Sequence, residues 1–169
     1  FLLKANSELL NNLGNFINRA LMFVSNNFGG VIQEMKLTSD DQELLALITR
    51  ELQGYVDNME QAILRDSIRN IMTISRLGNQ FMQANKPWVL VKGNPEEVSR
   101  AGTVVSLAAN IANLLSILLR PYMPQTSEVI QAQLNTPPES NVIYNEFVCH
   151  LPPGHKIGKP SPLFAKIDP

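Results

Sequence analysis

The chain has 169 residues, enough for one domain that buries roughly two-thirds of its unfolded surface. Its formal net charge of −1 argues against a general nucleic-acid binder, but it leaves room for a site that contacts a few phosphates. A single cysteine, Cys149, excludes an internal disulfide and favours a reducing compartment, and polar residues interrupt the longest apolar run, so no transmembrane helix is expected.

The first predicted helix covers about residues 7–27 and has two different faces. Positions about 100° apart give a broad apolar face made of Leu9, Leu10, Leu13, Phe16, Ile17, Ala20, Phe23 and Val24. On the other side, Asn11, Asn15 and Arg19 lie four residues apart and form a polar stripe. Their donors and acceptors can read base edges, but such a stripe is also the ordinary solvated face of an amphipathic helix.

A second predicted helix starts near Ser39 and reaches about Met59. Ser39 and Gln42 resemble a capping box, and Asp40 and Asp41 suit a helix N-terminus. The pattern places one apolar stripe in the core, consisting of Leu44, Ile48, Leu52, Tyr55 and Met59.

A third predicted helix covers about residues 61–84. Its apolar side consists of Ile68, Ile71, Ile74, Ser75, Phe81 and Met82. Its polar side consists of Arg65, Arg69, Arg76, Gln80 and Gln83. Pro87 is unfavourable inside a helix, so the only tryptophan, Trp88, is expected on a turn close to the end of this helix.

Pro95 suits the first turn of a fourth helix that extends to about Leu119. Its apolar arc is wide, and small or polar residues line its other side, namely Gly102, Ser106, Asn110 and Asn113. This composition predicts the central helix of a bundle, closely approached by its neighbours. A short fifth helix is expected over residues 125–133, and residues 142–148 read as either a short strand or an extended stretch.

Recognisable catalytic or metal-binding motifs are missing from the sequence. Cys149, His150 and His155 supply only three potential ligands, and their spacing fits none of the usual zinc patterns. Phosphate-binding loops and nucleophile motifs are also missing. The sequence therefore predicts neither a metal site nor a catalytic centre.

The ends of the chain predict a piece of a larger protein. The sequence begins with Phe1 inside a helical pattern and stops soon after Phe164. No signal peptide or targeting motif is recognisable.

Four segments in the same order resemble the anticodon-binding domain of methionyl-tRNA synthetases, and most closely that of the cytosolic eukaryotic form. They are NNLGNFINRALMFVSNNFGG in the first helix, ANKPW after the third, RAGTVVSLAANIANLLSILLRPYMP in the fourth, and GHKIGKPSPLFAKID near the end. Each motif is weak alone, but together they cover essentially the whole chain.

The resemblance implies roles for four residues. The Asn and Arg of the family that read the anticodon match Asn15 and Arg19, a further Asn one turn earlier matches Asn11, and the tryptophan that stacks on the anticodon matches Trp88. The arginines of the third helix, Arg65, Arg69 and Arg76, are candidate phosphate contacts, although they read equally well as solvated charges.

The resemblance also implies an all-α fold, a bundle of about five helices over residues 1–138. Residues 139–169 would return along the bundle toward a catalytic domain outside this chain. The implied function is recognition of the CAU anticodon of methionine tRNA in the cytoplasm, with no DNA or membrane partner. Catalytic motifs of the family have no counterpart here, so ATP and methionine would bind the catalytic domain and this chain would hold no cofactor.

Two other functions stay open on the sequence alone. The chain could be the anticodon domain of another class I synthetase, such as those for leucine, isoleucine, valine or cysteine. It could also be a helical protein-interaction scaffold that does not bind RNA. The combination of Asn15, Arg19 and Trp88 favours the methionine family over both.

Overall fold

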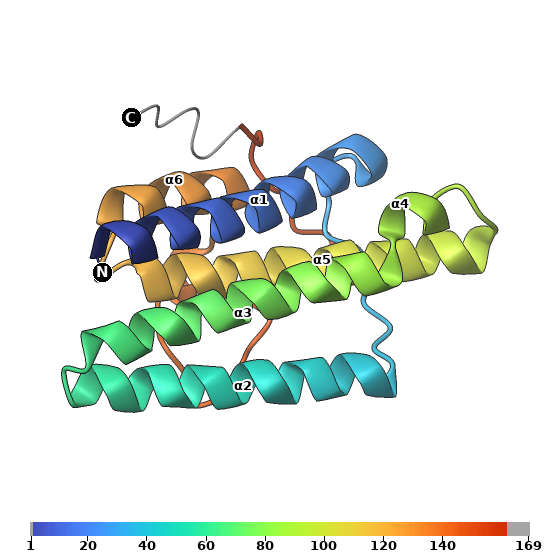
Figure 1. Cartoon of the computed structure of the whole chain (residues 1–169). Helices are drawn as coiled ribbons and strands as arrows, with labels where there is room; N and C mark the ends of the chain where they lie inside the picture. The colour runs from blue at the N-terminus through green and yellow to red at the C-terminus, as the bar shows by residue number, and fades with distance from the viewer. Residues whose placement is uncertain (1, 162–169) are drawn as a thin grey trace.

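The computed structural model describes residues 2–161, with side chains from residue 11 onward, and these residues form a helical bundle (Figure 1). Its helices are α1 (Leu2–Phe28), α2 (Ser39–Glu60), α3 (Leu64–Asn85), α4 (Pro87–Leu90), α5 (Pro95–Leu119) and α6 (Pro124–Leu134), followed by a 3₁₀ turn (Pro138–Ser140). Within residues 2–161 the only β-type pairing is one isolated bridge between Val31 and Lys156. The predicted all-α class is confirmed.

The central position predicted for the helix over residues 95–119 is also confirmed. Every residue of α5 from Ala101 to Leu119 is buried, and α1, α3, α4 and α6 all pack against this helix. In length and apolar character α5 would be able to cross a membrane, but that stretch is entirely buried inside the bundle, as expected of a core helix. Neighbours do approach its small residues closely, since a Cβ added to Gly102 would lie 3.1 Å from Cβ of Gln33.

After the last helices, residues 141–161 run back along the bundle without forming a strand. The backbone N–H of Phe147 donates to Thr49 of α2 at 3.0 Å. Asn110 of α5 then pairs with both backbone groups of Leu151, at 2.8 and 3.1 Å. Of the two alternatives for residues 142–148, the irregular extended stretch is the one observed.

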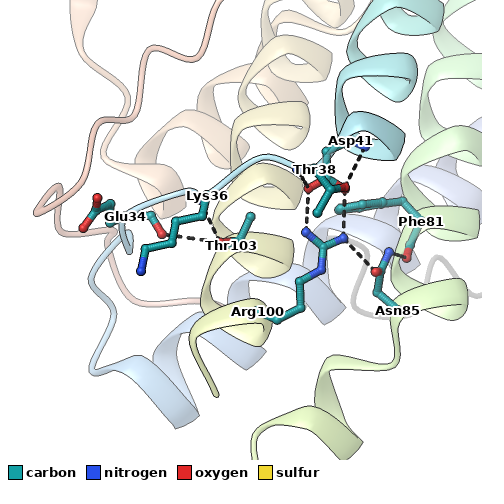
Figure 2. Close-up of polar contacts among 8 residues, drawn as sticks. All are labelled: Glu34, Lys36, Thr38, Asp41, Phe81, Asn85, Arg100 and Thr103. Atoms are coloured by element: carbon teal, nitrogen blue, oxygen red, sulfur yellow. Dashed lines mark hydrogen bonds and ion pairs between the residues drawn. The ribbon is translucent and has the colours of Figure 1, made fainter. Parts of the chain in front are cut away.

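A buried ion pair joins three helices at one end of the bundle (Figure 2). The side chain of Asp41, in the first turn of α2, is 0% exposed. Arg100, in α5, donates to its two carboxylate oxygens at 2.5 and 2.8 Å. The same guanidinium donates to Oδ1 of Asn85, the last residue of α3, at 2.8 Å. We refer to Asp41, Asn85 and Arg100 as the Arg100 corner.

Two local predictions were wrong by small amounts. The capping box of α2 uses Thr38 and Asp41 instead of Ser39 and Gln42, since the Asp41 carboxylate accepts from the backbone N–H of Thr38 at 3.0 Å while it pairs with Arg100. Trp88 lies in the short helix α4 and not on a simple turn. Lys86 takes a left-handed conformation, with φ of 47°, and Pro87 then begins a new helical turn.

The Arg100 corner makes the stability of the chain depend on the charge of Asp41. Burial alone would raise the pKa of Asp41, but hydrogen bonds from Arg100 and Thr38 outweigh burial and hold the pKa below its usual range. We expect Asp41→Asn to lower the free energy of unfolding at neutral pH by about 1.5–3 kcal/mol, because charged hydrogen bonds are lost. Denaturant unfolding monitored by circular dichroism measures this loss.

The difference in free energy of unfolding between the original chain and Asp41→Asn should depend on pH. A lowered folded pKa means that the carboxylate stabilises the fold above its ordinary pKa of about 4, and that this contribution disappears as pH falls through the folded value. The gap between the original chain and Asp41→Asn should therefore shrink in acid. The exposed neighbour Asp40 provides the control, since Asp40→Asn should change stability by no more than about 0.5 kcal/mol. A gap independent of pH would contradict this assignment.

Candidate nucleic-acid interface

The polar stripe of α1 lies on the surface, as its spacing predicted. Asn11 and Asn15 are exposed and Arg19 is half-buried, whereas the opposite face is in the core. That core face includes Leu13, Phe16, Ile17, Ala20, Leu21 and Val24. The side chains of Leu9 and Leu10 lie outside the described residues.

Folding brings Trp88 to this stripe. The guanidinium carbon of Arg19 lies 5.4 Å from the centroid of the Trp88 ring, which is a cation–π distance. Trp88 itself is half-buried, so part of its ring remains accessible. Two side chains from distant parts of the sequence thus meet at the surface where α1 and α4 approach each other.

Gln83 of α3 adds a third side chain to this contact. With its amide oxygen turned toward α1, Gln83 accepts hydrogen bonds from both terminal nitrogens of Arg19, at 3.2 and 3.3 Å. The guanidinium of Arg19 is therefore held between an indole ring and an amide. These two neighbours orient Arg19, and neither of them carries a charge.

A hollow of about 210 Å³ opens beside these residues, and we call it the Trp88 hollow. It is lined by Arg19, Met22, Phe23, Asn26, Asn27, Met82 and Trp88. For comparison, an apolar cavity of about 150 Å³ accepts a benzene ring. The Trp88 hollow therefore has room for one planar ring, and its lining combines apolar side chains with the amides of Asn26 and Asn27.

Three further α1 residues that line this hollow, Met22, Asn26 and Asn27, were not predicted from the sequence. Met22 and Asn26 lie three and seven residues after Arg19, so they continue the same helical stripe toward the C-terminal end of α1. Their spacing in the sequence could therefore have identified them as part of the stripe. Asn15 and Asn11 lie in the opposite direction, about 6 and 12 Å from Arg19 along the helix axis, and they extend the polar surface away from the hollow.

The spacing between α1 and α3 is set by a close contact next to Asn15. The ring of Phe16 packs directly against Gly78, and a Cβ added to Gly78 would lie only 2.6 Å from that ring. Glycine thus allows α3 to approach α1 closely enough for Gln83 to reach Arg19. A sequence pattern does not reveal such a contact, because it depends on which two faces meet.

The three candidate phosphate contacts lie on the exposed side of α3, outside the hollow. Arg69 is close to Asp66, with nitrogen and oxygen 3.6 Å apart, and both side chains are largely exposed. Along the axis of α3, Arg76 lies seven residues and about 10 Å before Gln83, and Arg69 lies about 21 Å before Gln83. Arg76 is therefore the arginine of this group nearest to the hollow along α3.

The residues considered for metal binding have other surroundings. Burial raises the pKa of the Cys149 thiol to about 11, so this group stays neutral. His150 lies against the ring of Tyr144, and a ring nitrogen of His155 is 2.9 Å from the backbone oxygen of Leu134. Among the described side chains, no group of three or more His, Cys, Asp or Glu residues is placed to hold a metal ion.

Comparisons with known proteins show the family to which the chain belongs. Residues 31–169 match the family described as the anticodon binding domain of methionyl tRNA ligase. The cytoplasmic methionine–tRNA ligase of Homo sapiens is 58% identical over 168 residues, which are 99% of this chain and 19% of that protein. The corresponding protein of Caenorhabditis elegans is 52% identical over 170 residues, covering 100% of this chain and 18% of that protein. The chain thus spans about a fifth of the relatives it matches.

A solved structure shows the same fold. The apo form of Mycobacterium tuberculosis methionyl-tRNA synthetase is similar with a TM-score of 0.81, over 98% of this chain and 34% of that chain. At 21% sequence identity, this likeness supports the fold alone. Together with the family match and the relatives above 50% identity, it leads to one conclusion: this chain belongs to the anticodon-binding domain family of methionyl-tRNA ligases.

Proposed function

We propose that this chain recognises the CAU anticodon of methionine tRNA as the C-terminal domain of a methionine–tRNA ligase. The observation that carries the proposal is the position of Arg19 over the ring of Trp88 at the edge of a hollow with room for one ring. Single-stranded bases are recognised by stacking on aromatic rings and by hydrogen bonds to their edges. The match to the anticodon binding domain of methionyl tRNA ligase points to a tRNA anticodon as the RNA that such a site would read.

In this proposal each side chain has a separate task. Trp88 provides a surface on which an unstacked base gains about 1–3 kcal/mol by stacking. The amides of Asn11 and Asn15 offer both a donor and an acceptor to base edges, and Arg19 offers a planar fork of donors. Gln83 holds Arg19 in place before RNA arrives, so less conformational freedom is lost on binding.

Phosphate contacts would position the RNA without reading its sequence. Arg76, on the exposed stripe of α3 that leads to Gln83, is the best-placed candidate, followed by Arg69 and Arg65. A net charge of −1 gives little general attraction to RNA, so the isolated domain should bind weakly.

The remaining steps of the reaction belong to the rest of the ligase. A catalytic domain in the same polypeptide would bind ATP and methionine, and residues 139–169 would contact that domain. The relatives are named cytoplasmic, which places the proposed activity in the cytoplasm. DNA and membranes have no part in this proposal.

The proposed function predicts a preference among anticodons. We expect the chain to bind a labelled stem-loop RNA with CAU in its loop more tightly than the same stem-loop with UAU. The reason is that Asn15 and Arg19 contact base edges that differ between the two RNAs. Fluorescence anisotropy at one fixed salt concentration measures both affinities. Equal affinities would sink the proposal and would favour a scaffold or another specificity.

The proposed function also predicts how the loss of Trp88 changes RNA binding and stability. Trp88→Ala should weaken binding of the CAU stem-loop by about 1–3 kcal/mol because a stacking surface is removed. Its effect on stability should remain below the roughly 3–5 kcal/mol expected for a tryptophan in the core, since the ring is half-buried. Anisotropy and thermal unfolding of the same samples measure the two quantities.

Val89, the next residue of α4, provides the matched control. Its side chain is 56% exposed, so Val89→Ala should change neither stability nor RNA binding appreciably. If Trp88→Ala strongly destabilises the chain yet binds the CAU stem-loop normally when folded, Trp88 is a structural residue and its proposed role is wrong.

A further inference from the structure

The Arg100 corner is connected to Trp88 by a very short length of chain. Asn85 ends α3, Lys86 follows in a left-handed conformation, and Pro87 begins the turn that contains Trp88. Proline fixes its own φ, and the left-handed region that Lys86 occupies is small and narrow for a residue other than glycine. The two residues between Asn85 and Trp88 therefore add little torsional freedom.

Asn85 is held from two sides. Its amide nitrogen donates to the backbone oxygen of Phe81 at 2.9 Å, and its amide oxygen accepts from Arg100 at 2.8 Å. Arg100 also lies over the ring of Phe81, with 6.0 Å from its guanidinium carbon to the ring centroid. The residue after Phe81 is Met82, which lines the Trp88 hollow. Arg100 therefore contacts α3 at two side chains one turn apart, Phe81 and Asn85, near its C-terminal end.

Asp41 fixes the direction of the guanidinium. It accepts two hydrogen bonds from Arg100 and one from the backbone N–H of Thr38, and its side chain is fully buried. A forked pair of this kind defines an orientation as well as a distance. An ion pair removed from water often contributes no more net stability than apolar residues of the same size, whereas its forked geometry gives the guanidinium a fixed direction.

We propose that Arg100, oriented by Asp41, is a positioning residue that acts through Asn85 to hold Trp88 in the orientation needed for anticodon reading. This inference rests on the proposed function, because it explains how the stacking surface is held. Arg100 does not line the hollow and does not stack on RNA in this proposal. Its effect is on discrimination between anticodons, since a tilted indole still stacks but no longer aligns a base with Arg19 and Asn15.

The decisive variant is Asn85→Ala, which removes the hydrogen bond between Arg100 and the end of α3 and leaves the Asp41–Arg100 pair intact. Asn85→Asp is a matched partial rescue, because a carboxylate still accepts from Arg100 but can no longer donate to the backbone oxygen of Phe81. Tyr55→Phe is the control for stability alone. Its hydroxyl donates to the backbone oxygen of Leu118 at 2.9 Å, near the opposite end of α5.

Two measurements are made on the 169-residue chain, each after circular dichroism has verified folding. The first is the fluorescence emission of the free protein, which reports on Trp88 alone because the chain has one tryptophan. The second is the ratio of affinities for the CAU and UAU stem-loops. We expect Asn85→Ala to shift the emission to longer wavelength and to lower the ratio about three- to tenfold. Tyr55→Phe should retain both values, and Asn85→Asp should lie closer to the original chain than Asn85→Ala in both.

Arg100→Lys gives a second route to the same result. Lysine keeps the positive charge next to Asp41 but lacks the planar fork that also reaches Asn85, so it should behave like Asn85→Ala. Unchanged emission and an unchanged ratio in both Asn85→Ala and Arg100→Lys would overturn the positioning role, even if the original chain prefers CAU. If the original chain shows no preference, the proposed function fails, and the emission shift still decides whether the Arg100 corner positions Trp88.

Discussion

Burial of α5 from Ala101 to Leu119 is the constraint on which the rest of the structure depends. Ala101 to Leu119 have no access to solvent for their polar side chains, so each of these groups must find a partner inside the protein. Four of these groups pair with segments outside α5, namely the connector between α1 and α2 and the residues that follow α6. Thr103 accepts from the N–H of Lys36, Ser106 from that of Gln33, Asn110 pairs with Leu151, and Asn113 accepts from Thr136. A single apolar helix thus fixes the paths of the connecting segments.

The candidate interface is built at one end of this arrangement. Arg100 precedes the fully buried stretch of α5 and holds the end of α3, after which the chain turns into α4. Phe16 and Gly78 bring α1 against α3 on the neighbouring side. The contact between Arg19 and Trp88 is therefore determined by packing between helices and does not depend on a flexible loop. Such support is what a site needs if it is to distinguish bases by shape and hydrogen bonding.

Sequence patterns predicted most of the helices because their apolar spacing and end signals agree. For α5, Pro95 marks the start, and the structure begins the helix there, with a capping box formed by Asn94 and Glu97. The polar stripe of α1 was equally readable from its spacing. The approach of Trp88 to Arg19 was expected only through the family resemblance, since periodicity does not say which helices meet.

Contacts that arise only from tertiary packing were missed. The sequence indicated only that Asp41 is a favourable charge at a helix N-terminus. In the structure its buried carboxylate pairs with Arg100, which is far away in the sequence. That pairing also explains why the cap uses Thr38 instead of Ser39. Glycine at position 78 gave no sequence signal, although it permits the close packing of Phe16. Met22 and Asn26 were visible as a continuation of the stripe, but the hollow that gives them a role exists only once α4 is in place.

The central claim is that a base of the anticodon stacks on Trp88, and the emission of this single tryptophan tests it directly. The measurement is a titration of the chain with unlabelled CAU stem-loop while Trp88 fluorescence is recorded. Stacking places the base against the indole, so we expect saturable quenching with a midpoint that agrees with the affinity obtained from a labelled RNA. Binding of the labelled RNA without any change in Trp88 emission would show that no base stacks on Trp88.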